Sequence, residues 1–102
     1  MRPFDIYDAV FTWRGCADMR PWLLLSAPSG GVLRCLPIAS ECYGASCFQM
    51  MKEDPDFAAT GLKKSCHIID SYVYQLAMGD LRRRRGELNG DLRRRFRQVS
   101  GG

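Results

Sequence analysis

Short apolar segments of strand length recur along most of the chain, and polar stretches containing proline or glycine separate them. Segments of this length, rich in β-branched and aromatic residues, are typical of β-strands. They predict strands at residues 5–11, 22–26, 32–38, 47–51, 65–69, 72–76 and 83–88. Polar residues and glycine predict loops over residues 12–19 and 52–61.

Two of the predicted strands are expected to pair as a hairpin. Residues 22–26 (WLLLS) and 32–38 (VLRCLPI) are both apolar, and residues 27–31 (APSGG) lie between them. A proline followed by two glycines favours a tight turn at that point.

The end of the chain predicts a helix. Its apolar residues recur at intervals of four, four and three, which places them on one helical face. These residues are Leu88, Leu92, Phe96 and Val99. Asn89 or Asp91 can cap the start of this helix, and its arginines fall on the other faces. Several short strands followed by one helix predict a mainly β fold, a small barrel with a C-terminal α-helix.

The composition is that of one globular domain. The chain has 102 residues, of which 46% are hydrophobic and 25% charged, so we expect a single domain over residues 1–102. The longest uninterrupted apolar run is residues 22–25, far shorter than the roughly 18 residues of a membrane span. The N-terminal residues contain no apolar stretch of the kind found in a secretory signal. We therefore expect a cytoplasmic protein with no membrane contact.

The net charge of +4 is unevenly distributed. Residues 82–97 contain eight arginines against Glu87 and Asp91, whereas residues 1–81 carry seven basic and nine acidic side chains. A basic C-terminal segment on a slightly acidic body favours a polyanion or an acidic protein as partner. A solvated helix face explains the same arginines equally well.

The five cysteines form no C-x-x-C motif, and His67 is the single histidine. We therefore expect reduced thiols that pack as small apolar residues. Adjacent residues of a strand point to opposite faces, so Cys66 and His67 are not expected to share a metal. Neither a metal site nor another cofactor is predicted.

Five segments carry a resemblance to a known family. Residues 4–9 (FDIYDA) are similar to an opening strand of the form G-D-I-V-x-V, and residues 20–26 (RPWLLLS) to R-P-x-L-V-L-S. Residues 37–40 (PIAS) are similar to P-I-T-S. Residues 61–71 (GLKKSCHIIDS) are similar to a G-L-x-x-x-S-x-x-x-x-D-Q block, and residues 84–88 (RRGEL) to R-R-x-G-x-L.

In this order the segments resemble the MazF/PemK family of toxin-antitoxin growth inhibitors. The resemblance implies an SH3-like barrel with a C-terminal helix, usually a homodimer. It also implies the toxin of a type II toxin-antitoxin system, a cytoplasmic endoribonuclease that cleaves single-stranded RNA without metal and is inhibited by an acidic antitoxin.

Metal-free RNA cleavage through the ribose 2′-hydroxyl needs a base, a cation that stabilises the phosphorane and an acid for the leaving oxygen. The resemblance implies that Arg20 is the catalytic arginine, because a fixed guanidinium can bridge phosphate oxygens. The family's catalytic threonine is Ala39 here. Ser40 can replace it only with a bulge or with a strand that ends at Ile38, an irregularity that Pro37 permits.

Asp70 corresponds to the acidic residue of the D-Q block, which implies a base-like catalytic role. Ser71 stands where the family has glutamine, and a bend residue that bonds backbone amides is the alternative for Asp70. Trp13 and Arg14 are candidates for RNA binding, because an aromatic ring stacks on an unpaired base while arginine meets phosphate. Core or dimer packing is the alternative for Trp13.

The leading prediction is thus an endoribonuclease toxin with the catalytic residues Arg20, Ser40 and Asp70. A catalytically impaired module that binds RNA or a protein partner is the alternative, and the methyl group of Ala39 motivates it. A gyrase poison similar to CcdB is a third hypothesis. CcdB proteins end in Trp-Gly-Ile, whereas this chain ends in VSGG at residues 99–102.

Overall fold

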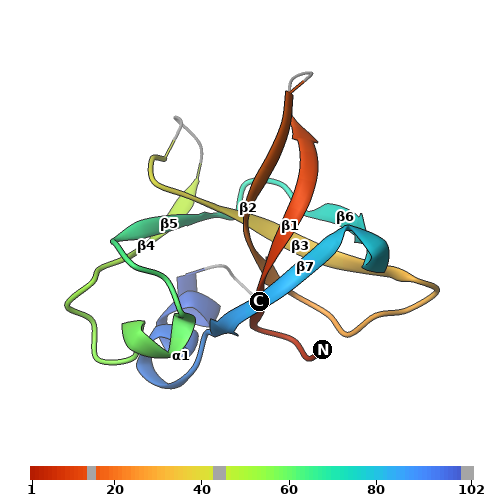
Figure 1. The fold of residues 1–102 in the computed structure, drawn as a ribbon. Coiled ribbons are helices and arrows are strands. Elements are labelled where there is room, and N and C mark those ends of the chain that lie inside the picture. Colours follow the sequence, from red (N-terminus) through yellow and green to blue (C-terminus); the bar gives the residue numbers. More distant parts are fainter. Residues whose placement is uncertain (14–15, 43–45, 100–102) are drawn as a thin grey trace.

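The computed structural model describes residues 1–13, 16–42 and 46–99, and for residues 12, 13 and 16 it describes the backbone alone. The described part is mainly β, with seven strands, two short 3₁₀ segments and one C-terminal α-helix (Figure 1). The strands are β1 (Asp5–Trp13), β2 (Cys16–Leu24), β3 (Val32–Ala39), β4 (Cys47–Met50), β5 (Cys66–Ile69), β6 (Tyr74–Ala77) and β7 (Leu81–Glu87). The helical segments are η1 (Phe57–Thr60), η2 (Met78–Asp80) and α1 (Gly90–Val99). The predicted fold class is confirmed.

All strand pairs are antiparallel, and the sheet runs in the order β4-β5-β3-β2-β1-β7. Strand β6 pairs with β3 outside this path. Strand β3 therefore contacts β2 and β6 along its length and β5 at its end, where Ala39 lies opposite His67. The predicted hairpin is confirmed, because Trp22 pairs with Pro37 and Leu24 with Cys35.

The predicted loop over residues 12–19 is wrong. Strands β1 and β2 continue through it as a long hairpin, from the pair Ile6–Leu23 to the pair Trp13–Cys16. The hairpin extends beyond the rest of the sheet (Figure 1). Its outer residues, such as Asp18, are exposed and lack the apolar alternation that marks a strand in sequence, so mutual backbone pairing keeps them extended.

Two hydrophobic clusters lie on the two faces of the central strands. Leu23 and Ile38 belong to the cluster beneath α1, whereas Trp22 and Leu24 belong to the cluster on the opposite face. Both faces of β2 are therefore buried at residues 22–24. This burial explains why the apolar run of residues 22–25 is continuous rather than alternating.

Helix α1 packs its apolar face near β4, where the ring of Phe96 meets that of Phe48 edge-on at 5.5 Å (Figure 1). Leu92 and Phe96 are buried, and so is Leu88 just before the helix. The prediction that Val99 shares this face is wrong. Its side chain is 65% exposed, because the last turn extends beyond the core.

A distant carboxylate holds the start of α1. The backbone amide of Asp91 donates to Oδ2 of Asp56, 35 residues earlier, at 2.6 Å. Neither predicted cap supplies this bond, and the Asp91 side chain instead pairs with arginines of its own helix. Gly90 adopts φ +55°, and a Cβ at this position would lie 2.5 Å from the Asp56 carboxylate. Glycine thus allows the carboxylate to approach the helix N-terminus closely.

We expect Asp56→Ala to lower the free energy of unfolding by about 1 kcal/mol, the typical cost of losing an N-terminal cap. Urea denaturation followed by circular dichroism measures the change. Glu53→Ala removes an exposed carboxylate from the same loop and serves as the control. Equal midpoints for the two variants would contradict this role of Asp56.

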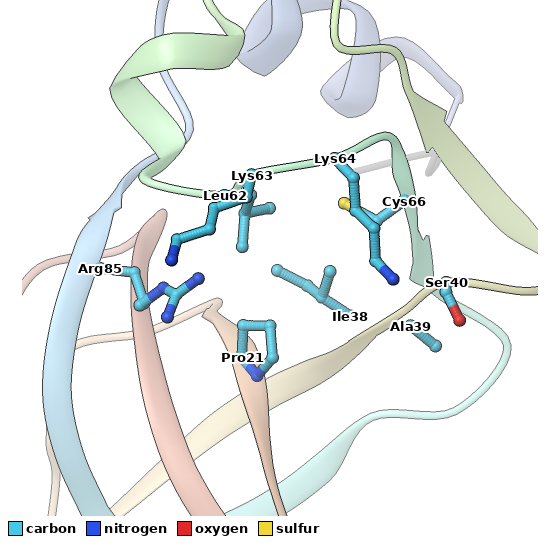
Figure 2. Close-up of a pocket in the computed structure, with 9 residues that line it drawn as sticks. All are labelled: Pro21, Ile38, Ala39, Ser40, Leu62, Lys63, Lys64, Cys66 and Arg85. Carbon is cyan, nitrogen blue, oxygen red and sulfur yellow. The ribbon is translucent and has the colours of Figure 1, made fainter.

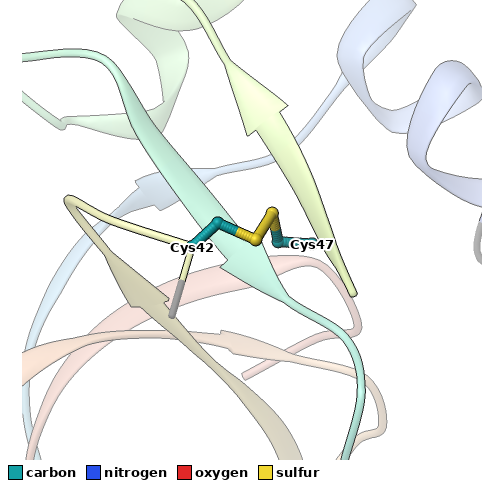
Figure 3. The surroundings of a disulfide bond; sticks show 2 residues. All are labelled: Cys42 and Cys47. Carbon is teal, nitrogen blue, oxygen red and sulfur yellow. A yellow bond between two sulfur atoms is a disulfide. The ribbon is translucent and has the colours of Figure 1, made fainter. Parts of the chain in front are cut away.

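Two of the five cysteines form a disulfide, which corrects the expectation of reduced thiols throughout. The Cα atoms of Cys42 and Cys47 lie 6.1 Å apart, and their sulfur atoms are bonded (Figure 3). Cys35 and Cys66 are free and buried, as predicted. Burial raises the pKa of Cys35 to about 12 and that of Cys66 to about 11, so both stay protonated at neutral pH.

Candidate functional site

Arg20 lies on β2 and is held by a carboxylate of its own strand. Oδ2 of Asp18 accepts from Nη2 of Arg20 at 2.6 Å and from Nε at 3.3 Å. The two residues share a face because they are two positions apart on a strand. The hydrogen bond and the charge of Arg20 hold the pKa of Asp18 below its usual value, so this carboxylate is ionised at neutral pH.

Asp18 was not among the predicted site residues. The sequence does contain opposite charges two residues apart, at Asp18 and Arg20, which on a strand would share a face. Because residues 12–19 were predicted as a loop, this spacing did not indicate that the two side chains meet. The pair orients the Arg20 guanidinium, whose side chain remains 23% exposed. A cation that is fixed yet accessible suits phosphate binding.

Aromatic rings accompany Arg20 on this face. Trp22, two residues further along β2, meets the ring of Tyr74 edge-on at 5.5 Å, and Tyr74 meets Tyr72 at 4.8 Å. Tyr72 is 66% exposed. Burial and the nearby Tyr72 raise the pKa of Tyr74, while the charge of Arg20 lowers it, which places the phenol and the guanidinium within electrostatic reach. Tyr72 was also missed, although the Y-V-Y alternation is visible in the sequence.

Ala39 is related to Arg20 by strand register. The ladder between β2 and β3 ends at Trp22 and Pro37, and one more step of two residues on each strand reaches Arg20 and Ala39. Strand alternation would place Ala39 on the side of Arg20, but Ala39 lines the same cavity as Pro21 and Ser40, which Arg20 does not line. A methyl group occupies the position of the family's threonine and can form no hydrogen bond.

Ser40 follows the last residue of β3 and lies on the rim of a cavity of about 410 Å³ (Figure 2). Strand β3 continues through Ala39, which pairs with His67, so the strand end at Ile38 that an exchange of roles between Ala39 and Ser40 requires is not present. Pro21 also lines this cavity. Because Arg20 is adjacent to Pro21 on a strand, it points to the opposite face of β2, and it does not line the cavity of Ser40.

Three cationic side chains surround the cavity of Ser40: Lys63, Lys64 and Arg85. Figure 2 shows Lys63 and Arg85 reaching toward one side of it and Lys64 toward the side of Ser40. Nη1 of Arg85 lies 3.6 Å from Oδ2 of Asp8, and its Nε is buried without a hydrogen-bond partner in the described structure. An apolar floor with a cationic rim can hold an anion. The two lysines were not predicted as site residues, although they are adjacent in the sequence segment GLKKS.

Asp70 lies elsewhere. It follows β5, its backbone amide donates to the carbonyl of Ser46 at 3.2 Å, and its side chain lines a second cavity of about 550 Å³. The three predicted catalytic residues thus lie at three separate places: Arg20 on the outer face of β2, Ser40 at the rim of one cavity and Asp70 in the wall of another.

The structure describes only part of the predicted RNA-binding pair, Trp13 and Arg14. Arg14 lies outside the described residues. The backbone of Trp13 pairs with Cys16 at the tip of the hairpin, and its side chain also lies outside the described structure.

Within the described residues, no three His, Cys, Asp or Glu side chains come close enough together to hold a metal ion. The same residues include no helix that is both long and apolar enough to cross a membrane.

No protein-family model and no curated protein sequence matches this chain. Among solved structures it is similar to the Mycobacterium tuberculosis toxin MazF-mt6, with a TM-score of 0.72. The match covers 95% of this chain and 92% of that chain at 20% sequence identity. At this identity the likeness is one of fold, and the chain therefore has the MazF-type fold that its sequence motifs predicted.

Proposed function

We propose that this protein is a MazF-like toxin that cleaves single-stranded RNA. The proposal rests on the MazF-type fold over 95% of the chain, which places the R-P motif of β2 with Arg20 accessible at the surface. We also propose that it acts in the cytoplasm as a single-domain homodimer, and that an acidic antitoxin inhibits it by covering cationic side chains that RNA would contact.

In the proposed reaction the ribose 2′-oxygen attacks phosphorus and loses its proton to solvent water, and the bond to the 5′-oxygen breaks. Arg20 stabilises the negative charge that develops on the phosphorane oxygens. Asp18 is a poor base because its pKa is lowered, so its role is to position Arg20. Tyr74 keeps its proton at neutral pH and can donate it toward the leaving 5′-oxygen.

Ser40 and Asp70 enter this proposal in a different role from Arg20. Each lines a cavity with cationic side chains and neither shares one with Arg20. We therefore propose that both contact RNA on either side of the cleaved bond, rather than the reacting atoms.

Incubating the purified protein with a long single-stranded RNA, with and without a chelator, tests the proposal. We expect cleavage at equal rates in both samples, with 2′,3′-cyclic phosphate ends, because no step requires a metal. A fully base-paired RNA is the control and should stay intact. RNA that is bound in a salt-dependent manner but never cut would instead favour the catalytically impaired module that Ala39 suggests.

A further inference from the structure

The arginines of the structure fall into two groups. One group forms ion pairs: Arg20 with Asp18, Arg84 with Asp5, Arg85 with Asp8, Arg94 with Asp91, and Arg95 with Asp54 and Asp91. The other group forms no ion pair with an acidic residue in the part of the chain that the structure describes, and it includes Arg34, Arg93 and Arg97. These three arginines, from β3 and α1, line one cavity.

This cavity has a volume of about 550 Å³ and an apolar interior to which Phe96 and Val73 contribute. The guanidinium of Arg93 lies 4.3 Å from the centre of the Phe4 ring, so an aromatic face keeps this cation near the cavity without neutralising it. Three cations around an apolar interior suit a ligand that carries both an anionic group and a flat apolar body.

Asp70 is the acidic residue in the cavity wall. Its Oδ1 is buried and has no hydrogen-bond partner among the described residues. A buried carboxylate oxygen without a donor is costly, so a ligand with N–H groups that reach this carboxylate would offset the cost. The same carboxylate repels a purely acidic ligand such as an acidic peptide. Nucleobases carry N–H donors, and a nucleotide also supplies the phosphate.

The cavity lies on the α1 side of the sheet, whereas Trp22 and Tyr74, beside Arg20, belong to the cluster on the opposite face. Val73 lines the cavity, while its neighbours Tyr72 and Tyr74 meet edge-on beside Trp22 on β2. The ring of Tyr72 is exposed and follows the cavity residue Asp70 by two positions in the chain. Alternating aromatic and cationic groups form the usual path of a single-stranded nucleic acid.

We propose that this cavity is a nucleotide subsite for single-stranded RNA, an inference that rests on the proposed function. The base occupies the apolar interior and donates to Asp70, and the phosphate meets Arg34, Arg93 and Arg97. Part of the arginine-rich C-terminal segment thus binds substrate, while its other arginines pair with carboxylates of the protein itself.

Fluorescence anisotropy with a labelled single-stranded 2′-deoxy oligonucleotide tests the subsite, because a strand without 2′-hydroxyls binds without being cut. We expect the double variant Arg93→Ala/Arg97→Ala to weaken binding by about tenfold or more at low salt. The slope of log affinity against log salt should flatten by about 0.7 for each phosphate that the variant no longer neutralises. Circular dichroism checks that the variant is folded.

The matched control is Arg83→Ala/Arg94→Ala, which removes the same charge from β7 and α1 at exposed positions that do not line the cavity. We expect the control to change oligonucleotide affinity by less than about twofold, because neither side chain lines the cavity. Loss of the exposed Arg94–Asp91 ion pair should also cost little stability. Equal losses in both double variants would overturn the subsite, since they would reveal a response to net charge alone.

Titration of the wild-type protein with 5′-nucleoside monophosphates, followed by amide NMR shifts, requires no variant. The amides of Asp70, Val73 and Phe96 should move. An acidic peptide that shifts these amides while nucleotides leave them unmoved would overturn the proposal. Oligonucleotide binding through the cavity without RNA cleavage would contradict the nuclease alone, whereas RNA cleavage with unaltered binding by the cavity variant would contradict the subsite alone.

Discussion

Arg20→Ala should reduce the rate of single-stranded RNA cleavage by about 100- to 1,000-fold, the usual cost of losing one preorganised group that stabilises transition-state charge. Arg20 is held by two hydrogen bonds from its guanidinium to Asp18, so little reorganisation is needed when phosphate binds. Initial rates on a labelled RNA measure the loss. It should fall mainly on kcat, because the charge develops only as the phosphorane forms.

Arg83→Ala is the matched control, because it removes an exposed arginine from β7 without touching β2. It should cleave within about twofold of wild type. An Arg20→Ala protein that is folded and cuts RNA at the wild-type rate would remove Arg20 from the mechanism.

The pH dependence follows from the lowered pKa of Asp18. A carboxyl whose pKa is lower in the folded protein stabilises it above the unfolded-state pKa of about 3.8, and this contribution is lost as the pH falls through the lowered value. The Arg20–Asp18 pair therefore stays intact throughout the neutral range, and Asp18 should add no acidic limb to the cleavage rate above about pH 5.

Gly86→Ala should lower the free energy of unfolding by about 3 kcal/mol or more, at the upper end of overpacking effects. A Cβ at Gly86 would lie 2.2 Å from the carbonyl oxygen of Ala59 and 2.6 Å from the carbonyl carbon of Thr60. Both atoms belong to the backbone of η1, so no side chain can rotate away to relieve the contact. At Gly61 a Cβ would lie 2.0 Å from the carbonyl oxygen of Arg85, which shows that η1 and β7 approach closely along their backbones.

Gly79→Ala is the control for this variant. A Cβ at Gly79 meets nothing within 4 Å, so we expect it to be neutral or to stabilise the protein by up to about 1 kcal/mol through the unfolded state. Urea denaturation of both variants measures the difference. A Gly86→Ala protein with the midpoint of wild type would mean that η1 can shift at no cost.

The sequence predicted most elements of the fold because local patterns carry them. Apolar runs of strand length located the strands, and a proline with two glycines located the turn between β2 and β3. Leu88, Leu92 and Phe96 marked the buried face of α1. The R-P and P-I-x-S motifs, in their order along the chain, also pointed to the MazF-type fold that the structural comparison supports.

The candidate site was harder to predict because it depends on which face each strand presents. Arg20 is adjacent to Pro21 in sequence, yet strand alternation directs it away from the cavity that Pro21 lines. Asp70 follows β5 and lines a cavity formed with side chains from β3 and α1, elements far from it in the chain. The spacing of residues in the sequence does not show that Arg20 and Asp70 lie at separate places in the fold.

By itself, then, the sequence determined the strand and helix pattern, the two-sided burial of β2 and the accumulation of charge near the C-terminus. The tertiary structure alone decided that Asp56 caps α1, that Cys42 bonds to Cys47 and that only some arginines have acidic partners. The physical reason is the sequence separation over which each interaction acts. Hydrophobic periodicity acts between near neighbours, whereas capping, disulfide pairing and charge pairing join residues that meet only after the chain has folded. The arginines behind the net charge of +4 thus fall into two sets: one set is paired with carboxylates, and the other surrounds a cavity.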